Sequence, residues 1–145
     1  VNFVNASVIA KERDIKVKET FSSESEDYMN LITIQVVTTE MTSTIAGSIF
    51  GKKDVRVVRI NNFRLEMIPY GHLALINNVD RPGVIGTIGS VLGKHDINID
   101  QMQVGQEKDG EKNIVFLRTD TPLPKEVLEK LSALETVKSV IHFEL

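Results

Sequence analysis

Apolar and polar residues alternate along most of the first half of the chain, with the period of a half-buried β-strand. The alternating stretches cover residues 15–20, 31–37, 43–50, 55–60 and 63–68. The last four stretches are separated by short turns that contain threonine, glycine, lysine and asparagine, at 38–40, 51–54 and 61–62. This pattern predicts an antiparallel meander.

The residues before the predicted meander favour a short helix followed by a loop. In the stretch 3–13, Val4, Val8 and Ile9 fall on one side, and Asn5 is available as a cap. The run of serine and acidic residues at 22–27 has no histidine or lysine base beside it, so we interpret it as a solvated loop. A sheet covered by a single helix is incomplete, and we therefore expect further chain to belong to this domain.

The second half of the chain changes to a mixed pattern after the turn residues 69–71, where we place a domain boundary. The expected domains are 1–70 and 71–145. The order strand, helix, strand, strand, helix, strand follows from the segments 72–78, 82–93, 97–105, 113–119, 124–133 and 137–143, with a turn at 108–110. A βαββαβ order predicts a ferredoxin-like antiparallel sheet with both helices on one face, because each crossover is right-handed. The fold class is therefore α+β.

The helix predicted at 82–93 contains several glycines, although each interior glycine costs about 1 kcal/mol relative to alanine. One side carries an apolar stripe that should face the sheet, formed by Val84, Ile85, Ile88, Val91 and Leu92. The glycines form an adjacent stripe without side chains, at Gly86, Gly89 and Gly93. This stripe either admits another backbone or only lets the helix lie close to its own sheet.

The start of this helix is a candidate binding position. Pro82 suits the first helical position, and Asp80 can accept hydrogen bonds from the free amides of the first turn. Gly83 leaves those amides approachable by a small ligand or a neighbouring subunit.

A second candidate site lies in the first half, where cations gather in a chain that is otherwise acidic. They are Lys52, Lys53, Arg56, Arg59 and Arg64, and guanidinium groups match phosphate and carboxylate oxygens. Strict alternation puts Arg56 and Arg59 on opposite faces, so a shared anion site requires a bulge or twist. The alternative is a solvated sheet edge kept soluble by charge.

Composition narrows the function classes. The 145 residues are 41% hydrophobic and 26% charged with a net charge of −3, which argues against nucleic acid or an acidic membrane as partner. The absence of cysteine excludes disulfides and thiolate metal sites, and His72, His95 and His142 lack ligand spacing. No apolar run approaches a membrane span, so we expect a cytoplasmic protein. The first residue is Val1, which indicates a piece of a longer polypeptide.

The stretch "LALINNVDRPGVIGTIGSVLGKHDINIDQMQVG" strongly resembles the opening of an ACT domain, a βαββαβ module that binds amino acids between paired copies. The resemblance is strongest to the ACT domains of bacterial D-3-phosphoglycerate dehydrogenases, NAD-dependent enzymes that begin serine biosynthesis. The first half is similar to the intervening domain of their long form, in "VNASVIAKERDIKVKE", "SSESEDY", "IAGSIFG" and "VRVVRINNFRLEM". The resemblance covers essentially the whole chain.

This resemblance implies a regulatory fragment that senses L-serine and self-associates through its ACT half. By position in the motif, the effector is expected at Asn78, Asp80 and Asn98, with its carboxylate near the amides of Gly83 and Val84. The cation cluster at Lys52, Lys53, Arg56 and Arg59 would accept phosphate or a phosphorylated substrate. NAD and catalysis would belong to domains absent from this chain, so the fragment itself is expected to be inert, with no cofactor and no metal.

Three other functions remain open at this point. The beta chain of bacterial iron–sulfur serine dehydratase carries a similar ACT sequence, although "SSESEDY" and the 3–13 helix fit the dehydrogenases better. A stand-alone amino-acid-binding or assembly module and a small free-standing enzyme are the alternatives from other classes.

Overall fold

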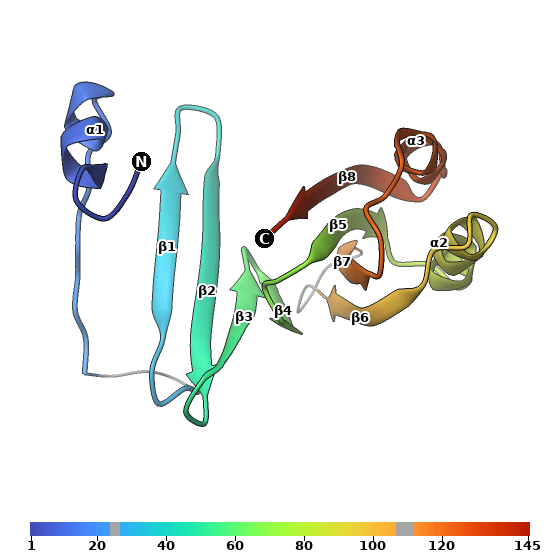
Figure 1. The fold of residues 1–145 in the computed structure, drawn as a ribbon, viewed down its shortest axis with the longest axis horizontal. Coiled ribbons are helices and arrows are strands. Elements are labelled where there is room, and N and C mark those ends of the chain that lie inside the picture. The colour runs from blue at the N-terminus through green and yellow to red at the C-terminus, as the bar shows by residue number, and fades with distance from the viewer. Residues whose placement is uncertain (24–26, 107–111) are drawn as a thin grey trace.

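A computed structural model describes residues 1–23, 27–106 and 112–145, and its strands form two antiparallel sheets (Figure 1). The N-terminal sheet has the order β1-β2-β3-β4, a meander in which each strand pairs with the next. Its strands are β1 (Ile32–Val37), β2 (Thr42–Phe50), β3 (Asp54–Ile60) and β4 (Phe63–Met67). The predicted meander is confirmed, because hairpins pair neighbouring segments of sequence.

The C-terminal sheet has the order β6-β7-β5-β8 and carries both of its helices on one face (Figure 1). Its strands are β5 (His72–Val79), β6 (Ile99–Gln106), β7 (Lys112–Thr119) and β8 (Val137–Glu144). The helices are α2 (Val84–Gly93) and α3 (Lys125–Ser132). This is the expected ferredoxin-like βαββαβ arrangement, and the α+β class is confirmed. The turn predicted at 108–110 lies outside the described residues.

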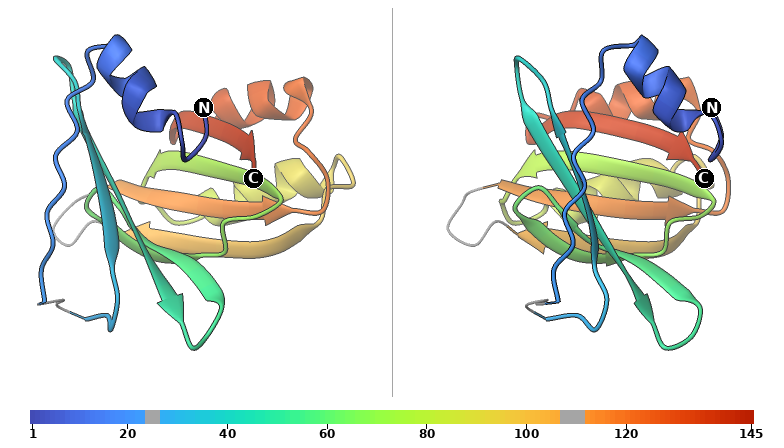
Figure 2. Two further views of the ribbon diagram at one scale, coloured as in Figure 1. Left: turned by 60° about the vertical axis from the view of Figure 1, so that its left-hand side comes forward. Right: turned by 90° about the vertical axis from the view of Figure 1, so that its left-hand side faces the viewer.

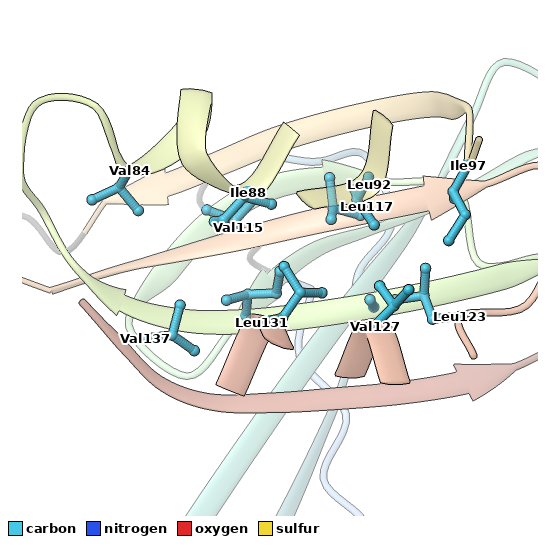
Figure 3. Packing of buried hydrophobic residues seen from close by; sticks show 12 residues of the cluster. Val84, Ile88, Leu92, Ile97, Val115, Leu117, Leu123, Val127, Leu131 and Val137 are labelled. Carbon is cyan, nitrogen blue, oxygen red and sulfur yellow. The ribbon is translucent and has the colours of Figure 1, made fainter. Parts of the chain in front are cut away.

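The main core lies between this sheet and its two helices (Figure 3). The predicted stripe of α2 faces it, since Val84, Ile88 and Leu92 are buried and Ile85 and Val91 are partly buried. A Cβ added at Gly86, Gly89 or Gly93 would meet no atom of the described chain within 4 Å. Close packing of α2 on its own sheet therefore does not explain these glycines, and the stripe faces outward.

A second core joins the two sheets, whose strands cross each other in the views of Figure 2. Leu73 and Phe116 point away from the helices and are fully buried against Val57, Leu65 and Met67 of the N-terminal sheet. The N-terminal sheet thus covers the face of the C-terminal sheet that the helices leave open.

Polar contacts fix the same junction. Glu66 donates its backbone N–H to Gln103 Oε1 (3.1 Å), and its carbonyl accepts from Gln101 Nε2 (3.1 Å). Gly105 lies where a side chain has no room, because a Cβ there would stand 2.9 Å from the carbonyl oxygen of Arg64. Strands β4 and β6 therefore touch through side chains and backbone without forming a continuous sheet.

Two predictions for the first residues need correction. Residues 15–20 alternate as expected but form no strand, and Ile15 and Val17 are 55% and 69% exposed. A strand needs a partner ladder, and these residues have none within the described chain. The helix exists as α1 (Ala6–Glu12), yet none of its residues is buried and Asn5 makes no side-chain cap; the Asn5 side chain accepts from the Asn2 N–H instead.

Candidate functional site

The predicted start of the second helix is displaced in the structure. Helix α2 begins at Val84, with Gly83 at its N-cap in a left-handed conformation (φ +89°). Pro82 consequently lies in the preceding turn and not at the first helical position. Because a side chain at Gly83 would be strained at this φ, glycine is required for the turn that joins β5 to α2.

Asn78 and Asp80 meet beside this turn, together with a residue that the sequence did not single out. Asn113 of β7 lies opposite Asn78 of β5 in the strand register. Its Nδ2 donates to Asp80 Oδ1 at 3.0 Å, while Asn78 Nδ2 donates to the Val79 carbonyl at 3.0 Å. We call Asn78, Asp80 and Asn113 the amide corner. The only signal in the sequence is an asparagine next to the apolar run at 114–117, at the start of the segment predicted as a strand.

Asn98 lies at the opposite end of the sheet. It precedes β6, is exposed, and donates its backbone N–H to Asp120 Oδ1 (3.0 Å) and its Nδ2 to Asp100 Oδ1 (3.3 Å). The amide corner is level with Gln106, the last residue of β6. At 3.3 Å per residue, eight strand positions separate the two ends by about 25 Å. One copy of the chain therefore does not bring Asn98 to Asn78 and Asp80.

The edge strand and the helix next to the amide corner leave a surface on which a second copy of the chain could pack. Strand β6 is an edge of the C-terminal sheet, and the glycine stripe of α2 faces outward. If two β6 edges pair antiparallel about a two-fold axis, the start of one strand lies beside the end of the other. Such pairing would place Asn98 of one copy at the same end of the joined sheet as Asp80 of the other, three strand spacings or about 14 Å away.

The cation cluster is gathered partly by a β-bulge in β3. Arg56 pairs with Ser48 and Arg59 with Ala46, so both arginines lie on one face of the sheet, although three positions separate them. The register shift between Ala46 and Gly47 accommodates Val58 as the extra residue. The bulge that a shared anion site requires is therefore present.

The two arginines differ in how their charge is used. Arg56 binds Asp54 (2.7 Å) and lies 3.7 Å from Glu66, and its bond to Asp54 raises the pKa of Arg56 and lowers that of Asp54. Arg59 Nε is shielded from solvent and meets no hydrogen-bond acceptor of the described residues. Lys52 and Lys53 lie exposed in the β2–β3 turn. Arg59 is consequently the better candidate for an anion.

Outside the amide corner and the cation cluster, the described residues form an apolar groove but no metal site. No group of three histidine, cysteine or acidic side chains is placed to hold a metal ion within the described chain. None of its helices is long and apolar enough to cross a membrane. A groove of about 440 Å³ between the two sheets is lined mainly by apolar side chains of β1, β2, β5 and β8 and contains none of the predicted site residues.

Comparison with known proteins identifies both halves. The family model described as the D-3-phosphoglycerate dehydrogenase intervening domain matches residues 1–61, and the ACT domain model matches residues 72–136. The whole chain aligns, at 39% and 38% identity over 145 residues, with D-3-phosphoglycerate dehydrogenases of Methanocaldococcus jannaschii and Bacillus subtilis. The chain therefore consists of a D-3-phosphoglycerate dehydrogenase intervening domain followed by an ACT domain.

In these relatives the chain corresponds to the regulatory part that carries the ACT domain. It spans 27% and 28% of the length of those two dehydrogenases. A solved ACT domain from the GTP pyrophosphokinase of Chlorobium tepidum is 22% identical, with a TM-score of 0.41 over 51% of this chain and 97% of that one. The two family models and the two dehydrogenases confirm the resemblance on which the effector residues were predicted, whereas the residues themselves stay a prediction.

Proposed function

We propose that this part of a D-3-phosphoglycerate dehydrogenase binds L-serine as a feedback effector between two copies of its ACT half. Asp80 supplies the counter-charge for the ammonium, and the amides of Gly83 and Val84 at the positive end of α2 receive the carboxylate. Asn78 and Asn98 serve the hydroxyl, with Asn98 contributed by the second copy. The function is regulatory, and this chain alone performs no catalysis.

The observation that carries the proposal is the gathering of Asn78, Asp80 and the left-handed Gly83 at the N-terminus of α2, beside an open sheet edge. The distance to Asn98 within one copy supports a site shared between copies, since a ligand bridging these residues needs a partner. Self-association through the ACT half is therefore part of the proposal. Light scattering tests this part, and a strictly monomeric mass at high concentration with and without serine would contradict it.

Thermal melting of the chain with L-serine tests the binding. A ligand that binds only the folded state adds about 2.7 kcal/mol at ~100 times Kd, and each kcal/mol moves the Tm of a chain of this size by roughly 2–4 °C. We expect a rise of about 5–10 °C with serine. L-Alanine should raise the Tm less, because it leaves the partners of the hydroxyl unpaired. A Tm indifferent to every amino acid would refute sensing by this domain.

The variant Asp80→Ala separates a ligand-binding role from a structural one. We expect it to remove most of the serine-induced rise, since the ammonium loses its counter-charge. Glu129→Ala, which removes an exposed acid of α3 remote from the site, is the matched control and should keep the full rise. If Asp80 only supports the turn, Asp80→Ala lowers the Tm but leaves the serine response unchanged.

Three further proposals concern the domain boundary, the place where NAD binds and the cellular location of the whole protein. We propose that residues 1–70 and 71–145 are separate domains, which fits the strand content of each sheet and the left-handed Gly71 (φ +84°) between them. NAD would bind in catalytic domains of the whole protein, outside this chain, and the whole protein would be cytoplasmic.

A second binding function is favoured by the bulge at Val58. We propose that Arg59 and Arg56, with Lys52 and Lys53 nearby in sequence, bind phosphate or a phosphorylated substrate. Calorimetry with inorganic phosphate tests this proposal, and Arg59→Gln should weaken binding more than Arg56→Gln, because Arg56 already has two acidic partners. Equal phosphate binding by the wild type and both variants would leave the cluster as surface charge only.

A further inference from the structure

The amide corner contains two buried acceptors that lack a donor. Asn78 and Asn113 are only 1% and 3% exposed, and both lie on the face of the sheet that packs against the helices. Each uses its Nδ2 group as a donor, yet within residues 1–23, 27–106 and 112–145 neither Oδ1 atom receives a hydrogen bond. Buried polar atoms in folded proteins are nearly always paired, so two unpaired oxygens on neighbouring strands require an explanation.

The other buried polar residue described in this sheet does have a hydrogen-bond partner. Thr119 lies at the other end of β7, is 4% exposed, and donates its hydroxyl to the Thr121 carbonyl at 2.7 Å. Among the described residues, three buried side-chain oxygens lack a partner. Two of them lie where β5 and β7 adjoin Asp80 and the N-terminus of α2, and the third, Gln101 Oε1, lies on β6 at the junction of the two sheets.

The chemistry of the corner is matched by a primary ammonium group. Such a group has three N–H donors and no acceptor. The corner presents a carboxylate, at Asp80, and two amide oxygens that need donors. A hydroxyl offers one donor and a carboxylate none, so neither group satisfies the corner in the same way.

We propose that Asn113 is a positioning residue of the effector site, which orients the Asp80 carboxylate and, with Asn78, makes the corner selective for a primary ammonium. In this refinement Asn78 binds the ammonium, and the hydroxyl is left to Asn98 of the second copy. The inference rests on the proposed function and states which group of the effector binds at the amide corner. Asn113 acts through its 3.0 Å bond to Asp80, which holds the carboxylate beside the turn that leads into α2.

Binding in this way requires the turn at 80–83 to move, because both amide oxygens are closed to solvent in the present conformation. One contact of the turn is weak, because the Val84 N–H reaches the Arg81 carbonyl only at 3.4 Å, and a Cβ at Gly83 would contact nothing within 4 Å in the described chain. The Gly83 carbonyl is held by the N–H (2.9 Å) and the hydroxyl (3.0 Å) of Thr87, so the start of the helix stays in place when this contact opens. An ammonium that enters here exchanges this weak contact for charged hydrogen bonds.

Isothermal titration with L-serine tests the role of Asn113. We expect Asn113→Leu to weaken serine binding by about 10- to 100-fold, because the Asp80 carboxylate loses the hydrogen bond from Asn113 that orients it. The matched control is Asn77→Leu. Asn77 precedes Asn78 on β5, points to the face of the sheet opposite to Asn78, and donates its Nδ2 to Ser139 Oγ at 2.8 Å. It should change the affinity less than about threefold.

A double-mutant cycle distinguishes positioning from a merely structural effect. In the Asp80→Asn background, Asn113→Leu should add less than about threefold, since a residue that acts through Asp80 has little left to position. Full additivity of the two losses would overturn the inference. So would a wild-type affinity for L-glycerate, which carries a hydroxyl in place of the ammonium, equal to that for L-serine.

The outcomes also separate this inference from the proposed function. If Asn113→Leu binds serine as well as the wild type, the inference fails while serine sensing stands. If the wild type ignores serine but binds another primary α-amino acid with an affinity that depends on Asn113, the serine assignment fails and the inference stands. Binding of no amino acid by the wild type refutes both.

Discussion

Replacing Gly105 by alanine tests the junction between the two sheets. The added Cβ would stand 2.9 Å from the Arg64 carbonyl oxygen, 3.1 Å from Ile114 Cγ2 and 3.2 Å from Phe63 Cβ. The oxygen belongs to the backbone of β4 and cannot rotate away, so β4 and β6 must separate. Overpacking of this kind costs about 1–3 kcal/mol, against about 0.4–1 kcal/mol gained from a less flexible unfolded chain.

The net loss of about 1–2 kcal/mol should lower the Tm by about 2–8 °C in differential scanning calorimetry. Gly89→Ala is the control of opposite sign, because its Cβ meets open space on α2 and alanine favours the helix by about 1 kcal/mol. It should raise the Tm at low protein concentration. A Gly105→Ala protein as stable as the wild type would refute the close contact of β4 with β6.

Three further outcomes are expected. Gly83→Ala should lower the free energy of unfolding by about 1–2 kcal/mol in urea titrations, because alanine is strained at φ +89°. Gly89→Ala should weaken self-association in sedimentation experiments if a second copy packs on the glycine stripe, and an unchanged association constant would argue against that contact. Lys130 donates a hydrogen bond to Glu126 and lowers the pKa of this carboxyl from 4.5, so the pair stabilises the fold above that pH. At pH 7 the wild type should therefore have a higher Tm than Glu126→Gln. This difference should disappear as the pH falls below the lowered pKa of Glu126.

Local patterns predicted the elements that form locally. The strands between residues 31 and 68 were located within one or two residues, since each pairs with its sequence neighbour across a turn such as Asn61, which is left-handed at φ +50°. The stretch 15–20 alternates equally regularly but forms no strand, because no other segment of the described chain pairs with it. Pairing is a property of two segments, and one segment cannot reveal it.

The candidate site shows the same limit. Asn113 became visible only through the register of β5 on β7, which places it opposite Asn78. The separation of Asn98 from Asn78, by contrast, was open to deduction: a βαβ crossover makes β5 and β6 parallel, so the end of one and the start of the other lie at opposite ends of the sheet. The sequence predicts that a shared anion site of Arg56 and Arg59 requires a bulge or twist. The position of that bulge, at Val58, became visible only in the strand register.

The paired contacts of Gln101 and Gln103 with Glu66 have a mechanical consequence. One glutamine holds the carbonyl and the other holds the N–H of the same residue, so β4 is attached to β6 at two points and cannot pivot about a single bond. A change in the twist of β6, the edge on which a second copy would add its strand, must therefore turn β4 with it. Because β4 pairs with β3, that rotation would also move the strand that carries Arg56 and Arg59. A movement at the edge of the C-terminal sheet would therefore be transmitted to the N-terminal sheet.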